Sequence, residues 1–84
     1  MAYKITYKRS VDHDLRTIPQ SKAKIILDRI EAQLPEKAKF CPVLKGRFAG
    51  LRKYRIGDYR VIFTILGNDV LILRIAQRGE AYRK

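Results

Sequence analysis

One stretch of the chain decides the fold: Tyr59-Arg60-Val61-Ile62-Phe63-Thr64-Ile65-Leu66, in which β-branched and aromatic residues favour a β-strand. Gly57-Asp58 before it and Gly67-Asn68-Asp69 after it have the composition of tight turns. Basic and apolar residues mix over positions 51–56, and a nearly continuous apolar run covers positions 70–76. Three strands joined by two short turns predict an antiparallel β-meander.

The beginning of the chain has the pattern of a short strand followed by a helix. Residues 3–7 alternate apolar and polar side chains, which is typical of a strand with one buried face. Apolar residues then recur at helical spacing over 11–18 and predict a helix of about two turns. We expect Ser10 to be its N-cap, and Asp12 and Asp14 to lie in the first turn at the positive end of the helix dipole.

Two prolines bracket a second helical pattern. Pro19 can begin a helix, because the N–H that it lacks is not needed there, and Pro35 is expected to end it. Residues 36–50 have no clear period and predict an irregular connection. The sequence therefore predicts an α+β fold in a single domain spanning 1–84: an N-terminal strand, an αα-hairpin and an antiparallel meander, with the helices packed on one face of a small sheet.

Positive charge dominates the composition. The chain has 19 Lys and Arg residues against 8 Asp and Glu residues, a formal net charge of +11, whereas small domains usually carry about 2–8 net charges. The excess lies mainly in the second half of the chain. A polyanion is the expected partner, because neutralising phosphates releases condensed counterions and drives binding. An acidic protein partner would satisfy the same charge.

Several classes of site are excluded by the residues that the chain lacks. With His13 as the only histidine, a two-histidine acid–base pair is impossible, and Cys41 has no second cysteine for an internal disulfide. No acidic, His or Cys residues have convincing metal-ligand spacing, so we expect no metal and no cofactor. Because no signal peptide and no run of about 20 apolar residues is present, we expect a cytoplasmic protein without a membrane segment.

Basic residues interleaved with tyrosines are the candidates for binding or chemistry. Side chains alternate across a strand, so Arg60 should lie on the face opposite Tyr59 and Val61. An arginine between apolar neighbours is costly to place without an anionic partner. That partner is either a phosphate or an acid of the chain, such as Asp58 or Asp69.

The block Gly50-Leu51-Arg52-Lys53-Tyr54-Arg55-Ile56-Gly57-Asp58-Tyr59-Arg60-Val61-Ile62-Phe63, preceded by Leu44-Lys45-Gly46, resembles the signature of the RelE/ParE toxin superfamily. Residues 75–82 resemble the closing strand and tail of that family, and residues 10–19 resemble its first helix and helix break. The resemblance covers essentially the whole chain and implies a RelE-like fold. It also implies one of two activities: RelE-like members cleave mRNA in the ribosomal A site without metal, and ParE-like members poison DNA gyrase. Both kinds are held inactive by a cognate antitoxin.

The resemblance also implies a site. Arg60 would hold the scissile phosphate, Arg78 would stabilise charge, and Tyr82 would transfer protons or stack on a base. Lys53 would be a phosphate ligand or a proton carrier. The catalytic set is thus Arg60, Arg78, Tyr82 and Lys53. The predicted RNA-binding residues are Lys45, Arg52, Arg55, Arg74 and Arg83.

One position departs from the RelE-like pattern. Leu51 stands where RelE-like ribonucleases often carry one of two alternating lysines, and the neighbouring Arg52 should face the other way. The leading hypothesis is a toxin that acts as a ribosome-dependent mRNA endoribonuclease, with a cognate antitoxin, mRNA and the ribosome as partners. The alternatives are a ParE-like gyrase inhibitor and a non-catalytic domain that binds RNA or an antitoxin.

Overall fold

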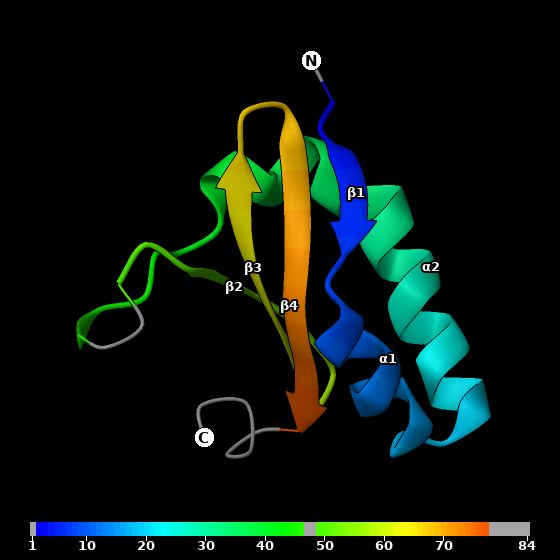
Figure 1. The fold of residues 1–84 in the computed structure, drawn as a ribbon. Helices are drawn as coiled ribbons and strands as arrows, with labels where there is room; N and C mark the ends of the chain where they lie inside the picture. Colours follow the sequence, from blue (N-terminus) through cyan, green and yellow to red (C-terminus); the bar gives the residue numbers. More distant parts are fainter. Residues whose placement is uncertain (1, 47–48, 78–84) are drawn as a thin grey trace.

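The computed structural model describes residues 2–46 and 49–77 and has the expected α+β architecture (Figure 1). Its elements are β1 (Lys4–Tyr7), α1 (Arg9–Arg16), α2 (Gln20–Lys37), the 3-10 turn η1 (Ala38–Phe40), β2 (Arg52–Ile56), β3 (Tyr59–Leu66) and β4 (Asp69–Gln77). The sheet has four strands in the order β1-β4-β3-β2. Strands β2, β3 and β4 form the predicted antiparallel meander, while β1 lies parallel to β4. None of the helices in this part of the chain is both long and apolar enough to span a bilayer.

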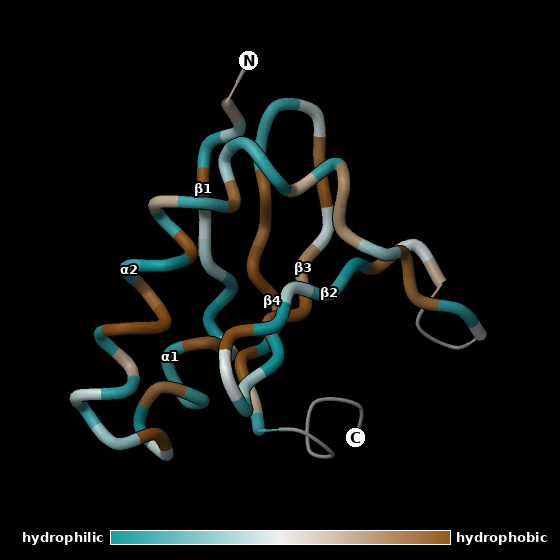
Figure 2. Tube along the Cα trace, turned by 180° about the vertical axis from the view of Figure 1, so that it is seen from behind, coloured by the Kyte–Doolittle hydropathy of each residue, from teal (hydrophilic) through white to brown (hydrophobic). Residues whose placement is uncertain are grey.

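The main core lies between the helices and one face of the sheet. Val61 and Phe63 of β3 are completely buried there, together with Ile30 and Leu34 of α2. Figure 2 shows β3 and β4 as mainly hydrophobic strands, whereas β2 at the edge is mainly hydrophilic. The alternation of side chains along β3 therefore separates a face that packs against the helices from a second, open face.

A smaller apolar cluster lies on that second face. Ile62 of β3 and Ala76 of β4 are buried, and Leu44 and Leu51 pack against them. Arg60 is half-buried on the same side as Ile62, as the alternation of the sequence predicts. The segment before β2 thus covers part of the sheet that the helices leave open.

The two meander turns are built on glycine. Gly57 between β2 and β3 has φ +57°, and Gly67 between β3 and β4 has φ +61°. These angles lie in the left-handed region, which costs glycine much less than other residues. The turn predictions at both positions are therefore confirmed.

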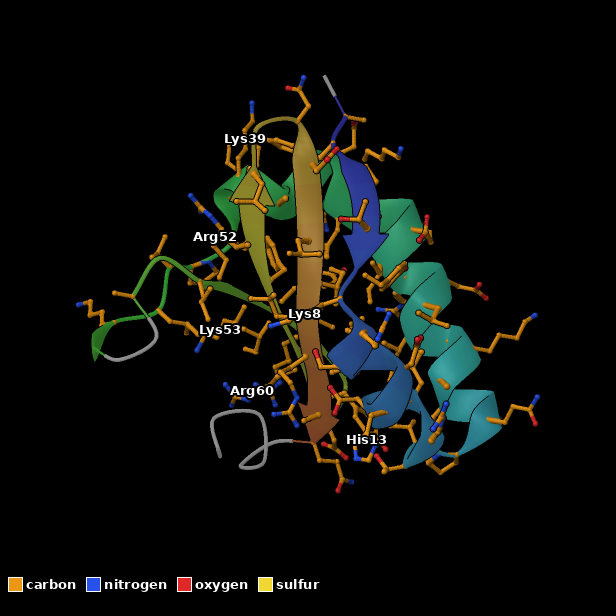
Figure 3. The ribbon with its side chains drawn as sticks, viewed as in Figure 1. Lys8, His13, Lys39, Arg52, Lys53 and Arg60 are labelled. Carbon is orange, nitrogen blue, oxygen red and sulfur yellow. The ribbon has the colours of Figure 1, made fainter. Side chains whose placement is uncertain are left out.

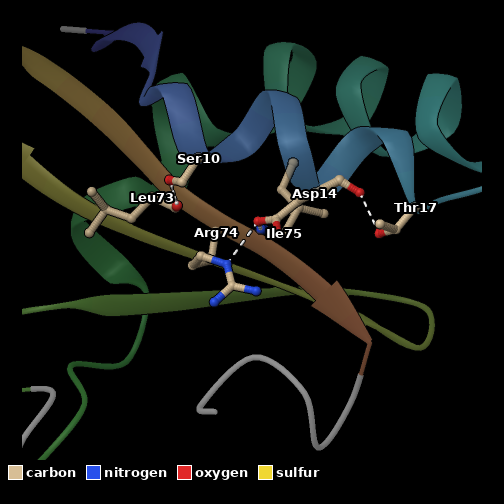
Figure 4. A network of polar contacts seen from close by, with 6 residues as sticks. All are labelled: Ser10, Asp14, Thr17, Leu73, Arg74 and Ile75. Atoms are coloured by element: carbon tan, nitrogen blue, oxygen red, sulfur yellow. Dashed lines mark hydrogen bonds and ion pairs between the residues drawn. The ribbon is translucent and has the colours of Figure 1, made fainter. Parts of the chain in front are cut away.

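Helix α1 lies along the edge of β4 beyond the point where β1 ends. Strand β1 pairs with β4 only as far as Ile72. Beyond that point, the Ser10 hydroxyl donates to the Leu73 carbonyl (2.7 Å), and Asp14 Oδ2 accepts the Ile75 N–H (2.9 Å), as drawn in Figure 4. Side chains of α1 therefore satisfy backbone groups that would otherwise be unpaired at this edge.

This arrangement corrects two sequence-based predictions. Ser10 is not the N-cap: α1 begins at Arg9, and the N-cap position is Lys8, which makes no side-chain capping hydrogen bond. The Ser10 hydroxyl is used by β4 instead. Asp14 does not lie in the first turn, where Asp12 is the acidic residue, and its side chain is buried against β4.

The prediction that Pro35 ends the second helix is also wrong. Helix α2 follows Pro19 as expected, but it continues through Pro35 to Lys37 and passes into η1, so residues 36–40 are not irregular. A proline inside a helix removes one N–H donor, and its ring crowds the carbonyl one turn earlier, which usually kinks or ends the helix. Complete burial of Leu34 and Ala38 holds the last turn, and the Ala38 N–H still donates to the Leu34 carbonyl.

Candidate functional site

Three cations of β2 and β3 lie together on the open face of the sheet. Lys53 of β2 pairs with Ile62 of β3, and Arg55 of β2 pairs with Arg60 of β3. Because alternate residues of a strand share a face, Lys53, Arg55 and Arg60 lie together on the side away from the helices, and we call them the basic face. Figure 3 shows Lys53 and Arg60 on the side of the sheet remote from α1 and α2.

The basic face concentrates positive charge at a cost. Arg55 and Arg60 are direct cross-strand partners, and like charges in this position destabilise a sheet. Arg55 is exposed, and its Nε donates to the Gly57 carbonyl at 3.3 Å. This hydrogen bond holds the guanidinium group beside the turn between β2 and β3. A cluster of this kind is suited to an anion that bridges several cations, such as a phosphodiester.

A groove of about 560 Å³ continues from the basic face around the edge of β2. Its lining residues are Lys37, Phe40, Cys41, Pro42, Lys53, Tyr54, Arg55 and Arg60. The Tyr54 hydroxyl donates to the Gln33 side chain. Burial raises the pKa of Tyr54, although the positive charge of Arg29 opposes the shift. Tyr54 is therefore a neutral phenol at physiological pH.

Cys41 in this groove has the character of a structural thiol. Its Sγ donates to the Lys37 carbonyl at 3.4 Å. Burial raises the pKa of Cys41, and this outweighs the opposing positive charges of Arg52 and Lys37. Because the thiolate is the nucleophilic form, a raised pKa lowers the reactivity of this cysteine at neutral pH.

Arg52 lies on the other side of β2. It pairs with Phe63, whose side chain belongs to the core, so Arg52 faces away from Lys53, as the sequence led us to expect. Its Nη1 donates to the carbonyl oxygens of Lys39 (3.2 Å) and Cys41 (2.9 Å). These contacts hold η1 and the following residues against β2. The assignment of Arg52 to RNA binding stays a prediction.

Arg74 is engaged by an ion pair. Its Nε donates to Asp14 Oδ2 at 2.9 Å (Figure 4), and the Arg74 side chain is 38% exposed whereas that of Asp14 is only 8% exposed. The burial of Asp14 has a signal in the sequence, because Asp14 shares a helical stripe with Val11 and Ile18. An acid on an apolar helix face has to find a partner inside the fold.

The structure brings only part of the predicted site together. Lys53, Arg55 and Arg60 share one face, and Arg74 of β4 lies on the same face as the cross-strand partner of Ile62, although its Nε is bonded to Asp14. Lys45 is exposed in the loop before β2. Leu51 points to the same side as Lys53 and packs into the small apolar cluster. The predicted site residues Arg78, Tyr82 and Arg83 lie outside the described residues.

Comparison with known protein families shows which family the chain belongs to. A family model described as the ParE toxin of the type II toxin–antitoxin system parDE matches residues 5–82. The chain belongs to the RelE/ParE toxin superfamily. The protein is therefore the toxin component of a type II toxin–antitoxin system. No curated protein sequence is significantly similar to it.

Solved structures share the fold of this toxin. The RelBE2 toxin–antitoxin complex of Mycobacterium tuberculosis contains a chain with a TM-score of 0.85 and 22% identity, covering 93% of this chain and 100% of that one. A chain of the archaeal RelE–RelB complex from Pyrococcus horikoshii has a TM-score of 0.66 and 28% identity, with coverage of 96% and 100%. A chain of the chromosomal ParDE system of P. aeruginosa has a TM-score of 0.69 and 19% identity, with coverage of 90% and 96%. The fold is thus common to proteins named RelE and ParE.

Proposed function

We propose that this toxin binds mRNA in the ribosomal A site through its basic face and cleaves it there. The observation that carries the proposal is the common orientation of Lys53, Arg55 and Arg60 on the open face of the sheet. Phosphate oxygens are the natural ligands of such a cluster, and the excess positive charge of the chain favours a nucleic-acid partner.

The proposed reaction is a transesterification within the RNA strand. The ribose 2′-oxygen forms a bond to the neighbouring phosphorus, and the bond from phosphorus to the 5′-oxygen breaks. The 2′-hydroxyl gives up a proton, and the leaving 5′-oxygen takes one up, so the products are a 2′,3′-cyclic phosphate and a 5′-hydroxyl. Fixed cations stabilise the extra negative charge that develops on the phosphate oxygens.

Each side chain of the proposed site suits a different part of this reaction. Arg60 can donate two hydrogen bonds from its planar guanidinium to the scissile phosphate, but arginine is a poor base because it stays protonated. Lys53, on the same face, can bind phosphate or carry a proton. We assign proton transfer at the leaving oxygen to Tyr82 through the family resemblance. A phenol carries its proton at neutral pH and can therefore donate it to the leaving oxygen, and neighbouring cations would make it a stronger acid.

A cognate antitoxin is the second proposed partner. The similar chains of M. tuberculosis and P. horikoshii were solved as a RelBE2 complex and a RelE–RelB complex. An acidic antitoxin would neutralise part of the net charge of +11 and could cover the basic face.

Two observations favour gyrase inhibition as a second candidate. The matching family model is described as the ParE toxin. Leu51 also brings an apolar side chain, instead of a lysine, to the open face beside Ile62. Under this alternative the same face would contact a protein rather than mRNA.

Induction in cells separates the two functions. Wild-type toxin should halt translation and produce new mRNA 5′ ends, and Arg60→Ala combined with Tyr82→Ala should abolish both effects. Lys24→Ala, which removes an exposed cation from α2 on the other side of the molecule, is the matched control and should keep full activity. A DNA-damage response without mRNA cuts would favour gyrase inhibition, and full toxicity of the double variant would refute the proposed site.

A further inference from the structure

Phe40 is exposed at the outer end of the groove. It is 75% exposed, more than any other large apolar side chain in the described part of the chain. Full burial of a phenylalanine side chain is more favourable than exposure to water by roughly 1.5–3 kcal/mol. An exposed ring beside a groove is available to a ligand that covers it.

The turn that carries Phe40 is well anchored. Ala38 of η1 is completely buried, and Arg52 Nη1 bonds to the carbonyl oxygens of Lys39 and Cys41 on either side of Phe40. The Cys41 N–H also donates to the Ala38 carbonyl at 3.2 Å. The fold thus holds the ring in the open instead of leaving it on a frayed end.

Charge around the ring indicates the chemistry of the ligand. Lys39 Nζ lies 5.3 Å from the centroid of the Phe40 ring, and Lys37 lines the groove near the end of α2. The groove then reaches Lys53 and the rest of the basic face, and none of the described residues that line it is an acid. Cations that follow a groove and alternate with an exposed aromatic ring are typical of surfaces that bind single-stranded nucleic acid.

We propose that Phe40 stacks against a base of single-stranded RNA, next to the phosphodiester held by the basic face. The inference rests on the proposed function, because it requires the strand to cross that face. The exposed ring among cations favours RNA over an acidic peptide, because bases stack on aromatic side chains. A strand that is bound at Lys53 and Arg55 and follows the groove passes the edge of β2, where Phe40 lies. The groove volume of about 560 Å³ is in the range of small-ligand sites.

The absence of tryptophan from the chain allows a direct test. Phe40→Trp introduces a single indole at the proposed stacking position, and a short single-stranded RNA should quench its fluorescence saturably. Val43→Trp is the matched control: Val43 is 50% exposed on the same segment but does not line the groove, and its indole should be quenched much less. Replacing one base of the RNA by an abasic site should remove the quenching at one position of the strand.

Affinity gives the second measurement. Phe40→Ala should weaken RNA binding roughly 5- to 150-fold, the range that alanine substitution of stacking aromatic residues produces. Val43→Ala should leave the affinity unchanged. Circular dichroism of each variant checks that the fold is retained.

The outcomes distinguish this inference from the proposed function. If RNA binds with strong salt dependence but abasic sites change neither quenching nor affinity, base stacking is refuted and the basic face stands. If an acidic peptide quenches the Phe40→Trp indole and RNA does not, the groove is a protein-docking site and the inference is overturned. If no variant binds RNA even at low salt, both the inference and the proposed function fail.

Discussion

The buried carboxylate of Asp14 offers the sharpest test of the structure. Its Oδ2 accepts hydrogen bonds from Ile75 N and Arg74 Nε, both at 2.9 Å. Asp14→Ala would leave the buried Ile75 N–H without its partner, which costs about 1–3 kcal/mol. The lost ion pair adds at most about 1 kcal/mol, because the Arg74 side chain is 38% exposed and solvent screens the pair.

The expected loss of unfolding free energy for Asp14→Ala is therefore about 1–4 kcal/mol. A domain of this size should lose roughly 5–30 °C in melting temperature as a result. Asp14→Asn keeps an oxygen acceptor for Ile75 N–H and loses only the charge, so it should cost about 1 kcal/mol. Asp12→Ala changes an exposed acid of the same helix and should stay within about 0.5 kcal/mol of the wild type.

Urea unfolding followed by circular dichroism measures these differences. Equal m-values for the variants would show that only stability has changed. The account of the β4 edge is refuted if Asp14→Ala is as stable as Asp12→Ala, or if the asparagine variant is as unstable as the alanine variant.

Three further outcomes follow from the structure. Lys53→Ala should weaken RNA binding. The slope of log K against log salt concentration should become shallower by about 1, because one phosphate contact is lost. An unchanged slope would contradict a contact between Lys53 and phosphate. Phe63→Ala should cost about 3–5 kcal/mol in urea unfolding, because the side chain is completely buried. Burial and a 2.5 Å hydrogen bond to Glu31 raise the pKa of Tyr7. The resulting stabilisation is complete below about pH 10, the unfolded value, and is lost as the pH rises through the folded value. Between about pH 10 and 12 the wild type should therefore lose more stability than Tyr7→Phe, and parallel pH profiles would contradict this.

Much of the fold can be predicted from local sequence patterns. The turn at Gly57 and the alternation along β3 were enough to predict the meander and to place Arg60 away from the helices. These features depend on neighbours in sequence, where turn chemistry and side-chain period act directly.

The remaining features depend on long-range contacts. The parallel pairing of β1 with β4 and the use of Ser10 by the Leu73 carbonyl join opposite ends of the chain. Helical continuation through Pro35 depends on the burial of Leu34, and the position of Phe40 depends on where Arg52 anchors η1. Tertiary packing overrides local propensity in each of these cases.

The central claim is that the basic face binds and cleaves mRNA on the ribosome. Its most direct test adds purified toxin to ribosomes programmed with a defined mRNA and maps the products. The account predicts cuts in the A-site codon with 2′,3′-cyclic phosphate ends, and a loss of about 100-fold or more in cleavage rate for Arg60→Ala. Intact mRNA with the wild-type toxin, together with inhibition of DNA supercoiling by purified gyrase, would contradict it.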